Sequence, residues 1–320
     1  MRIFLDSGAF TAWSRGKVIN IDDYISFIYK YKDTIDVYAN LDVIGSPEKT
    51  WENQMIMEKA GLLPLPVFHT PFEDVKWLQR YLEQGYDYIA LGGMAGGTIS
   101  KTRIIKHLNS VFPNLLCDQE GLPKVKVHGF GMTALQLVYK YPWYSVDSAS
   151  WQLRGSAYGL VDVPRTPGKL TKKEHFYITS LPISKGVKKY KSNADATETS
   201  SPLFSIDSIS QYEVSFLKRK TYKKDIENFM EMYGFTLEEL QNDSRMRAVW
   251  NAFYSILSIS KFTDTILYLA ASDLKAVRAL RRKMRQTQLG LDKINVLISF
   301  ATLGGKSKRF DTLIKLKYTQ

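Results

Sequence analysis

Residues 37–54 read VYANLDVIGSPEKTWENQ, and they contain one complete unit of the fold that the first half of the chain repeats. Val37–Leu41 is a short apolar run typical of a buried strand, and Asp42 stands directly after it. Ser46 and Pro47 then form a helix start signal, because serine is a common N-cap and proline suits the first helical position. This stretch therefore predicts a strand, a turn that begins with a carboxylate, and a helix that starts at Pro47.

Short apolar runs alternate with amphipathic stretches throughout residues 1–150. Six strand–helix alternations imply parallel strands joined by crossover helices. Because no dinucleotide-type glycine fingerprint follows the first strand, the pattern favours an α/β fold of the TIM-like (β/α)8 barrel type over a doubly wound sheet. The expected strands are Ile3–Leu5, Val37–Leu41, Leu65–Phe68, Tyr88–Leu91, Val125–His128 and Tyr144–Val146. The expected helices lie near residues 21–32, 47–60, 72–84, 99–109 and 132–140.

The pattern changes in the second half of the chain. Runs at residues 158–163 and 176–183 are expected to supply the last strands of the barrel, and the small polar residues 191–202 predict a linker. Beyond the linker, spaced apolar residues predict helices at residues 207–220, 223–233, 236–241, 244–260 and 264–286. We therefore expect a barrel domain at residues 1–190 and a basic, mainly helical region at residues 203–320.

The composition is that of an ordinary soluble protein. The chain has 320 residues, of which 44% are hydrophobic and 24% are charged. Its single cysteine, Cys117, excludes an internal disulfide and any zinc site built from several cysteines. No apolar run approaches the roughly 20 residues of a membrane span, and the N-terminus lacks a signal-peptide pattern. We therefore expect a cytoplasmic protein with no membrane partner.

The positive charge lies in the second half of the chain. The net charge is +12; residues 1–160 hold 16 Lys and Arg against 16 Asp and Glu, whereas residues 161–320 hold 28 against 16. Basic clusters lie at residues 185–191, 217–224 and 275–285. Each cluster alone fits a solvated helix face, but three of them beside a neutral half favour a surface for nucleic acid. The residues expected to contact it are Lys188, Lys189, Lys218, Arg219, Lys220, Arg281, Arg282, Lys283 and Arg285.

Polar residues and glycines follow the expected strands at their carboxyl ends, where parallel barrels keep their active sites. Three of them are carboxylates and two are histidines. In chain order they are Asp6, Ser7, Gly8, Asp42, His69, Gly92, Gly93, His128, Gly131 and Asp147. Because strand ends of this kind meet at one face of a barrel, we expect these residues to converge.

Each of these residues also has a purely structural interpretation. An aspartate after a strand is often a helix N-cap, His128 fits a hydrogen-bonded core histidine, and glycines often serve turns alone. Their joint placement instead favours chemistry that needs two or three carboxylates and little else. Glycosidic bond exchange is such chemistry, since one carboxylate attacks the anomeric carbon while a second moves protons on the departing or arriving group. A third carboxylate can accept the N–H donors of a guanine edge.

Five short motifs occur in the order found in tRNA-guanine transglycosylases, and the chain resembles that superfamily over residues 1–160. The motifs are LDSGAF (5–10), LDVI (41–44), ALGGMAGG (90–97), HGFGMTAL (128–135) and SVDSASW (145–151). Enzymes of the superfamily are barrels that exchange guanine for a 7-deazaguanine base. Through YANLDVIGSPEKTWENQ (38–54) and LPVFHT (65–70) the chain most resembles the DpdA-type DNA 7-deazaguanine transglycosylases of phages and some bacteria.

The resemblance implies a role for each matching position. Asp147 matches the nucleophile that holds the sugar covalently after guanine leaves, and Asp6 matches the general acid/base. Asp42 matches the carboxylate that reads the guanine-like edge, and His69 stands where the tRNA enzymes usually place a glutamine. Substrate-binding roles are implied for Ser7, Gly8, Asp42, His69, Gly92, Gly93, His128 and Gly131.

Two departures from the tRNA enzymes shape the expected activity. Their zinc site needs three cysteines and a histidine, which one cysteine cannot supply, so we expect no metal and no other cofactor. Thr98 stands where bacterial tRNA enzymes have a glutamate, which favours a base with a neutral 7-substituent, such as the nitrile of preQ0. The resemblance thus implies exchange of guanine in DNA for a preQ0-like 7-deazaguanine, a modification that would help a phage evade restriction in the host cytoplasm.

Two alternatives remain open. One is a zinc-free tRNA-guanine transglycosylase, and the other is a barrel that only binds nucleic acid or a nucleobase, with its carboxylates acting as helix caps. The sequence leaves open the oligomeric state, the DNA context and the choice between single and double strands.

Overall fold

The computed structural model describes residues 1–70, 72–94, 99–164, 172, 178–182, 222–287, 289–303 and 307–318. The chain divides into two compact units. Unit 1 comprises Met1–Ser148, Asp264–Ser272 and Ile294–Gln320, and unit 2 comprises Ala149–Thr263 and Asp273–Lys293. This division differs from the expected boundary near residue 190, because unit 1 includes strands from the C-terminal third of the chain.

Unit 1 contains a curled sheet of eight parallel strands, so the α/β class is confirmed. The strands follow one another in the order β2-β1-β10-β9-β6-β5-β4-β3. All six strands expected in the first half are present. The strands are β1 (Ile3–Asp6), β2 (Val37–Tyr38), β3 (Val67–His69), β4 (Tyr88–Gly92), β5 (Lys126–Gly129), β6 (Ser145–Ser148), β9 (Ile266–Ala270) and β10 (Asn295–Ser299).

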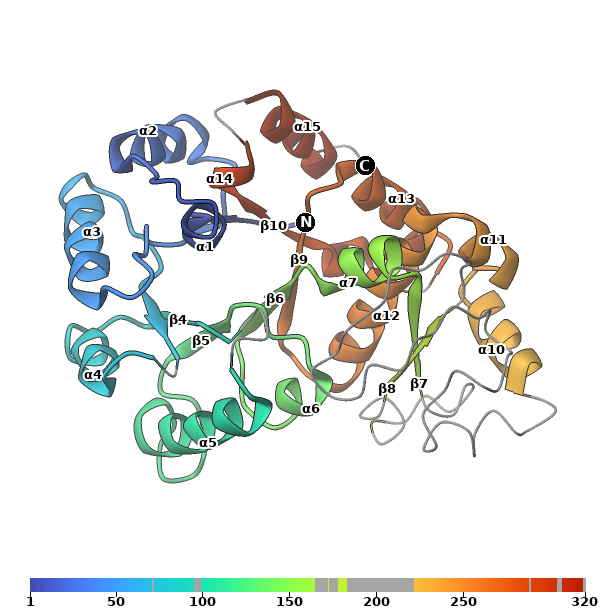
Figure 1. Cartoon of the computed structure of the whole chain (residues 1–320), viewed down its shortest axis with the longest axis horizontal. Coiled ribbons are helices and arrows are strands. Elements are labelled where there is room, and N and C mark those ends of the chain that lie inside the picture. Colours follow the sequence, from blue (N-terminus) through green and yellow to red (C-terminus); the bar gives the residue numbers. More distant parts are fainter. Residues whose placement is uncertain are drawn as a thin grey trace. The chain divides into compact units, whose positions relative to one another are not determined.

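Helices connect the strands of unit 1 in the predicted order, and Figure 1 shows α2, α3, α4 and α5 one after another around the outside of the strands. Helix α3 begins at Pro47 as predicted, but Ser46 makes no side-chain capping bond. The helices of unit 1 are α1 (Ala9–Trp13), α2 (Ile21–Tyr31), α3 (Pro47–Lys59), α4 (Val75–Glu83), α5 (Lys101–Val111), α6 (Leu135–Val138), α14 (Phe300–Leu303) and α15 (Ser307–Tyr318), with a π-helical turn at Phe112–Leu116.

The last two strands of the sheet come from the C-terminal third of the chain, contrary to the prediction. Ile266 of β9 pairs with Ser145 of β6, and Val296 of β10 pairs with Ile3 of β1. The expected helix at residues 264–286 is therefore wrong in its first part. Its second part is correct, because Asp273 accepts the backbone N–H of Lys275 and starts α13 (Leu274–Met284).

The runs at residues 158–163 and 176–183 do form strands, but outside this sheet. They become β7 (Leu160–Pro164) and β8 (Ile178–Pro182), which pair antiparallel in a separate two-stranded sheet. The expectation that they complete the barrel is wrong, because β9 already occupies the edge of β6.

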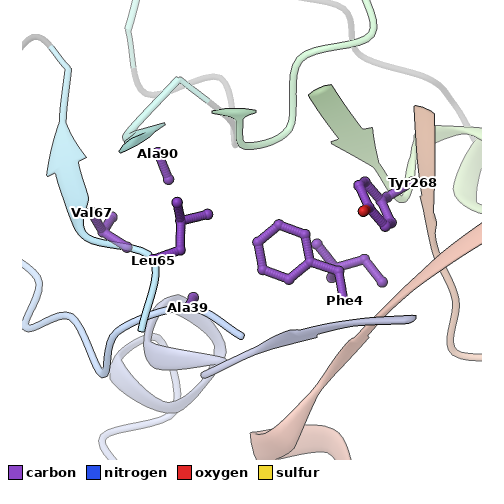
Figure 2. Close-up of a cluster of buried hydrophobic side chains, with 7 residues drawn as sticks. Phe4, Ala39, Leu65, Val67, Ala90 and Tyr268 are labelled. Atoms are coloured by element: carbon purple, nitrogen blue, oxygen red, sulfur yellow. The ribbon is translucent and has the colours of Figure 1, made fainter. Parts of the chain in front are cut away.

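A cluster of buried side chains fills the interior of the curled sheet. Figure 2 shows Phe4, Leu65 and Val67 pointing toward one another, and each is 4% exposed or less. Phe4 contacts Tyr268 edge-to-face, with ring centroids 5.3 Å apart. Phe4 stands two residues before Asp6, so the strand that carries this carboxyl group is anchored in the apolar interior.

Unit 2 is organised around α12 (Ser244–Phe262), a helix whose middle is buried on most sides. Its Asn251 accepts the backbone N–H of Asp162 and donates to the carbonyl oxygen of Leu160, both at 2.9 Å, so polar side chains of the helix fix β7. The other described elements of unit 2 are α7 (Ser150–Gln152), a π-helical turn at Leu153–Ala157, α10 (Tyr222–Glu231), α11 (Leu237–Asn242), α13 and a 3-10 turn at Leu291–Lys293. Residues 191–202 and 207–220, expected as linker and helix, lie outside the described residues.

No helix in the described ranges is both long enough and apolar enough to cross a membrane.

Candidate active site

The end of β1 is held in place by close packing around Gly8. Gly8 has φ 79°, and a Cβ there would lie 2.3 Å from Ser299 Oγ and 2.9 Å from the backbone nitrogen of Ala301. No other residue fits this position without moving the chain that follows β10. The turn that carries Asp6 and Ser7 is thereby fixed.

Among the described carboxyl groups, Asp6 has the pKa most changed by its surroundings. Loss of solvation, followed by repulsion from the carboxylates of Asp42 and Asp147, raises the pKa of Asp6 to about 8. Hydrogen bonds from the backbone of Gly8 and Ser7 act in the opposite direction but are outweighed. Three carboxyl groups from β1, β6 and the segment after β2 thus converge as predicted, and Asp6 holds a proton at neutral pH.

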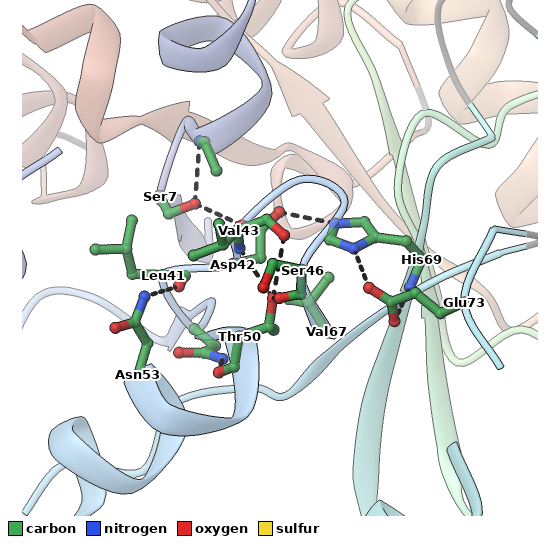
Figure 3. A network of polar contacts seen from close by, with 12 residues as sticks. Ser7, Leu41, Asp42, Val43, Ser46, Thr50, Asn53, Val67, His69 and Glu73 are labelled. Atoms are coloured by element: carbon green, nitrogen blue, oxygen red, sulfur yellow. Dashed lines mark hydrogen bonds and ion pairs between the residues drawn. The ribbon is translucent and has the colours of Figure 1, made fainter. Parts of the chain in front are cut away.

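A chain of polar contacts connects the ends of β1, β2 and β3, as Figure 3 shows. Ser7 Oγ donates to Asp42 Oδ1 at 2.9 Å, and the other oxygen, Asp42 Oδ2, lies 2.9 Å from His69 Nε2. On the far side of the ring, His69 Nδ1 lies 2.7 Å from Glu73 Oε1, and Glu73 Oε2 accepts the backbone N–H of His69 at 3.0 Å. Asp42 and His69 therefore come together as predicted, and Glu73 is an additional member.

Helix α3 fixes the segment that carries Asp42. Thr50 Oγ1 accepts the backbone N–H of Val43 at 2.9 Å, and Asn53 Nδ2 donates to the carbonyl oxygen of Leu41 at 2.7 Å (Figure 3). Both side chains lie on the first turns of the helix that starts at Pro47. The helix thus fixes the backbone on either side of Asp42, from which the carboxylate reaches His69.

His69 is a charged ring between two carboxylates. Burial lowers the pKa of His69, but the hydrogen bonds and charges of Asp42 and Glu73 outweigh it and raise the pKa to about 10. The ring is therefore an imidazolium at neutral pH, and it has no proton-free nitrogen with which to act as a base. Its arrangement suits it to holding Asp42 ionised and fixed rather than to proton transfer.

We expect Glu73→Gln to lower the free energy of unfolding by about 1–3 kcal/mol at pH 7, the range for impairing a buried hydrogen bond to a charged group. The folded-state pKa of His69 is raised above 6.5, so its stabilisation is fully present below pH 6.5 and is lost as pH rises through about 10. In the variant the folded-state pKa should be lower, so this loss should be smaller and complete at lower pH. Urea unfolding at several pH values measures it, with the exposed Glu83→Gln on α4 as control; equal pH dependence in variant and wild type would contradict the assignment.

Gly92 and Gly93 at the end of β4 are required by packing. A Cβ on Gly92 would lie 3.1 Å from His69 Cδ2, and one on Gly93 would lie 2.6 Å from the carbonyl oxygen of Thr70. Gly93 also has φ 78°, a left-handed conformation that favours glycine. Packing alone explains why both positions require glycine, so their role in binding a base stays a prediction.

Asp147 lies on β6 and is surrounded by groups from β5 and the turn after it. Gly131 N donates to Asp147 Oδ1 at 3.0 Å, and His128 Nε2 lies 3.3 Å from the same oxygen. Asp147 is 6% exposed and His128 is fully buried. The structure thus places both predicted residues, His128 and Gly131, directly against Asp147, and His128 is at the same time a core residue.

The basic residues expected to contact nucleic acid fall into two groups. Lys188, Lys189, Lys218, Arg219 and Lys220 lie outside the described residues, whereas the other four belong to α13 and its C-cap. Of these, Lys283 is engaged within unit 2, because its Nζ donates to Glu239 Oε2 at 2.9 Å and to the carbonyl oxygen of Gly234 at 2.6 Å. Arg281 is partly buried, whereas Arg282 and Arg285 are exposed.

Within the described residues, no group of three or more His, Cys, Asp or Glu side chains has the arrangement needed to hold a metal ion. Thr98, the residue on which the expected 7-substituent depends, lies outside the described residues.

Comparison with known proteins identifies no family. No protein-family model, no curated protein and no solved structure matches the chain.

Proposed function

We propose that the protein is a DNA-guanine transglycosylase that exchanges guanine in DNA for a 7-deazaguanine base. The observation that carries the proposal is the convergence of Asp6, Asp42 and Asp147, in which one carboxyl group has a pKa near 8 because of its burial and the other two. Carboxyl groups whose surroundings set their pKa values apart divide the roles of acid and nucleophile between them. The choice of guanine and a 7-deazaguanine base as substrates rests on the resemblance of the five sequence motifs to the transglycosylases.

In the first step, a carboxylate oxygen of Asp147 gives an electron pair to C1′ of the target nucleotide. The bond between C1′ and N9 breaks, its electrons move to the base, and Asp6 gives the leaving guanine its proton. In the second step, the ionised Asp6 takes the N9 proton of the incoming 7-deazaguanine, and N9 attacks C1′ as the glycosyl ester breaks. Asp147 and Asp6 thereby return to their starting states.

Asp42 is the group that we assign to base recognition. Ser7 Oγ and His69 Nε2 each occupy one of its oxygens, which leaves one further lone-pair position on each for N–H donors of a bound base. A guanine-like edge offers two such donors, the ring N–H and the amino group. Gly92 and Gly93 complete this end of the site.

We also propose that the sheet of unit 1 closes into a (β/α)8 barrel. A parallel bridge between Ala39 and Leu65, beside the terminal strands β2 and β3, supports closure. Asn40 N donates to the Leu65 carbonyl oxygen, and Leu65 N donates to the carbonyl oxygen of Tyr38, both at 2.9 Å. In a closed barrel the three carboxyl groups would lie at the same end, around the carboxyl ends of the strands.

Nucleoside analysis of cells that express the protein together with a 7-deazaguanine pathway tests the function. The proposal requires a 7-deazaguanine nucleoside in DNA, and a neutral 7-substituent such as the nitrile of preQ0 is expected. The same nucleoside in tRNA alone would favour the zinc-free tRNA enzyme. Its absence from both polymers, despite abundant free base, would favour a barrel that only binds nucleic acid or base.

The basic C-terminal half is the proposed surface for DNA, and its contribution from α13 should come from Arg282 and Arg285. We expect their joint replacement by Gln to lower the slope of log affinity against log salt by about one to two units, since each lost phosphate contact removes roughly 0.9. Lys283→Gln is the matched control, because Lys283 is already held by Glu239. Titrations of fluorescent DNA at several salt concentrations measure the slope; an unchanged slope in the double variant would remove α13 from the surface.

A further inference from the structure

A chain of hydrogen-bonding side chains leads from Asp147 into the interior of unit 1. His128 Nδ1 lies 2.7 Å from Ser145 Oγ, and Ser145 Oγ lies 2.5 Å from Tyr88 Oη. The register of the sheet brings these groups together, because His128 pairs with Ala90 of β4 on one side and with Ser145 of β6 on the other. The sequence motifs and the proposed reaction assign nothing to Ser145 or Tyr88.

The proton on His128 can be placed from its neighbours. His128 Nε2 faces Asp147 Oδ1 at 3.3 Å, although at an angle that makes no full hydrogen bond. Two acceptors held this close in a buried site would repel one another, so Nε2 carries a proton. The ring packs against Phe4 and Phe130, with centroids 4.7 and 4.6 Å away. The ring thus presents Nε2 to Asp147 and Nδ1 to Ser145.

With Nδ1 free of a proton, the hydrogen bonds between Tyr88, Ser145 and His128 can run in only one donor-to-acceptor direction. Nδ1 accepts the O–H of Ser145, and Ser145 Oγ in turn accepts the O–H of Tyr88. In the part of the chain that the structure describes, Tyr88 Oη has no hydrogen-bond partner other than Ser145. The reverse direction would therefore leave the Tyr88 hydroxyl without a protein acceptor.

Both contacts of Asp147 involve the same oxygen. Gly131 N and His128 Nε2 approach Oδ1, whereas Oδ2 has no hydrogen-bond partner among the described residues. We infer that Oδ2 is the oxygen that attacks C1′, and that Tyr88, Ser145 and His128 are positioning residues that hold Oδ1 and so direct Oδ2 toward the substrate. This inference rests on the proposed transglycosylase function.

The same geometry serves both steps of the exchange. As Oδ2 bonds to C1′, Oδ1 becomes the carbonyl oxygen of the ester and remains next to the same two N–H groups. When the incoming base displaces the ester, the electron pair of the C1′–Oδ2 bond returns to Asp147. The N–H groups on Oδ1 stabilise the carboxylate that reappears.

The tautomer of His128 tests the proposed hydrogen bonds from Tyr88 through Ser145 to His128 without an activity measurement. In protein labelled with ¹⁵N-histidine, two-bond ¹H–¹⁵N correlation spectra at neutral pH should show the His128 ring protonated on Nε2 and unprotonated on Nδ1. His128→Gln identifies its signals. A ring protonated on Nδ1 in a protein that exchanges guanine would overturn the positioning chain and leave the proposed function standing. No exchange by the wild-type protein would overturn the function and the role of Oδ2 with it.

Kinetics of the wild type and variants test the positioning role. Tyr88→Phe and Ser145→Ala should each lower kcat by about ten- to a hundredfold, the scale of a small misplacement of a reacting group, with KM for the incoming base unchanged. Tyr144→Phe is the matched control, since Tyr144 contacts Tyr88 edge-to-face but lies outside the chain. Unchanged kcat in both variants, or a change in KM alone, would overturn the inference.

Discussion

Asp147→Asn is expected to abolish guanine exchange, with a loss of at least about 10³-fold, as for removal of a nucleophile that acts within a catalytic unit. An amide cannot form the glycosyl ester on which both steps depend. The fold and DNA binding should persist, because asparagine keeps an oxygen that can accept the N–H of Gly131, as Asp147 Oδ1 does now. Incorporation of labelled guanine into DNA measures the exchange.

A covalent intermediate gives this prediction a second readout. Wild-type protein incubated with DNA in the absence of an incoming base should yield a protein–DNA complex that survives denaturation, and the variant should not. Asp87→Asn is the matched control, since Asp87 is an exposed carboxylate of unit 1 that forms an ion pair with Lys126 at 3.4 Å. Exchange at near wild-type rate in Asp147→Asn would show that another group is the nucleophile.

Asp6→Asn should lower the exchange rate by about 10²–10⁴, the usual contribution of a positioned acid or base. Asparagine cannot give the leaving guanine a proton or take one from the incoming base. In the wild type, the first step should slow as pH rises through about 8, because Asp6 then loses the proton that it must donate. Single-turnover guanine release across this pH range measures both effects.

The same substitution should lower activity but raise stability relative to wild type as pH increases. The folded-state pKa of Asp6 is raised from 3.8 to about 8, so its contribution to stability is fully present below 3.8 and is lost as pH rises through 8. Asp6→Asn removes this ionisation, and we expect its Tm relative to wild type to increase between about pH 5 and about pH 9. The exposed Asp87→Asn should show no such trend. A constant difference in Tm for Asp6→Asn would mean that Asp6 ionises normally.

The strands and helices of the first half could be predicted because each signal is local. Residues 37–54 give a strand, a turn and a helix start in turn, and α3 begins at Pro47 as the sequence indicates. The C-terminal strands could not be predicted in the same way. Ile266–Ala270 is a short apolar run that fits the spacing of either a helix or a strand, and only its pairing with β6 decides between them. The run that forms β10 was not predicted.

The same distinction applies to the candidate site. Asp6, Asp42 and Asp147 could be found because each follows an apolar run, and a parallel sheet brings such positions to one edge. Glu73 could not, since its contact with His69 depends on the path of the loop between β3 and α4. The only signal was its position four residues after His69. Ser145 and Tyr88 were missed because they lie within strands, where sequence alone does not distinguish a packed hydroxyl from one that holds a catalytic group.

The pairing of β1 with β10 has a consequence for how the protein acquires its activity. Ile3 pairs with Val296, so β1 can pair early with β2 but gains its second neighbour, β10, only after the chain up to β10 has been made. Contacts between residues so far apart form late and slowly, because a long loop must close before they stabilise the structure. The turn at Gly8 also lies against Ser299, the last residue of β10, and against Ala301 just after it. We therefore expect Asp6 to reach the position that the proposed reaction requires only after β10 has joined the sheet, and the protein to be inactive until then.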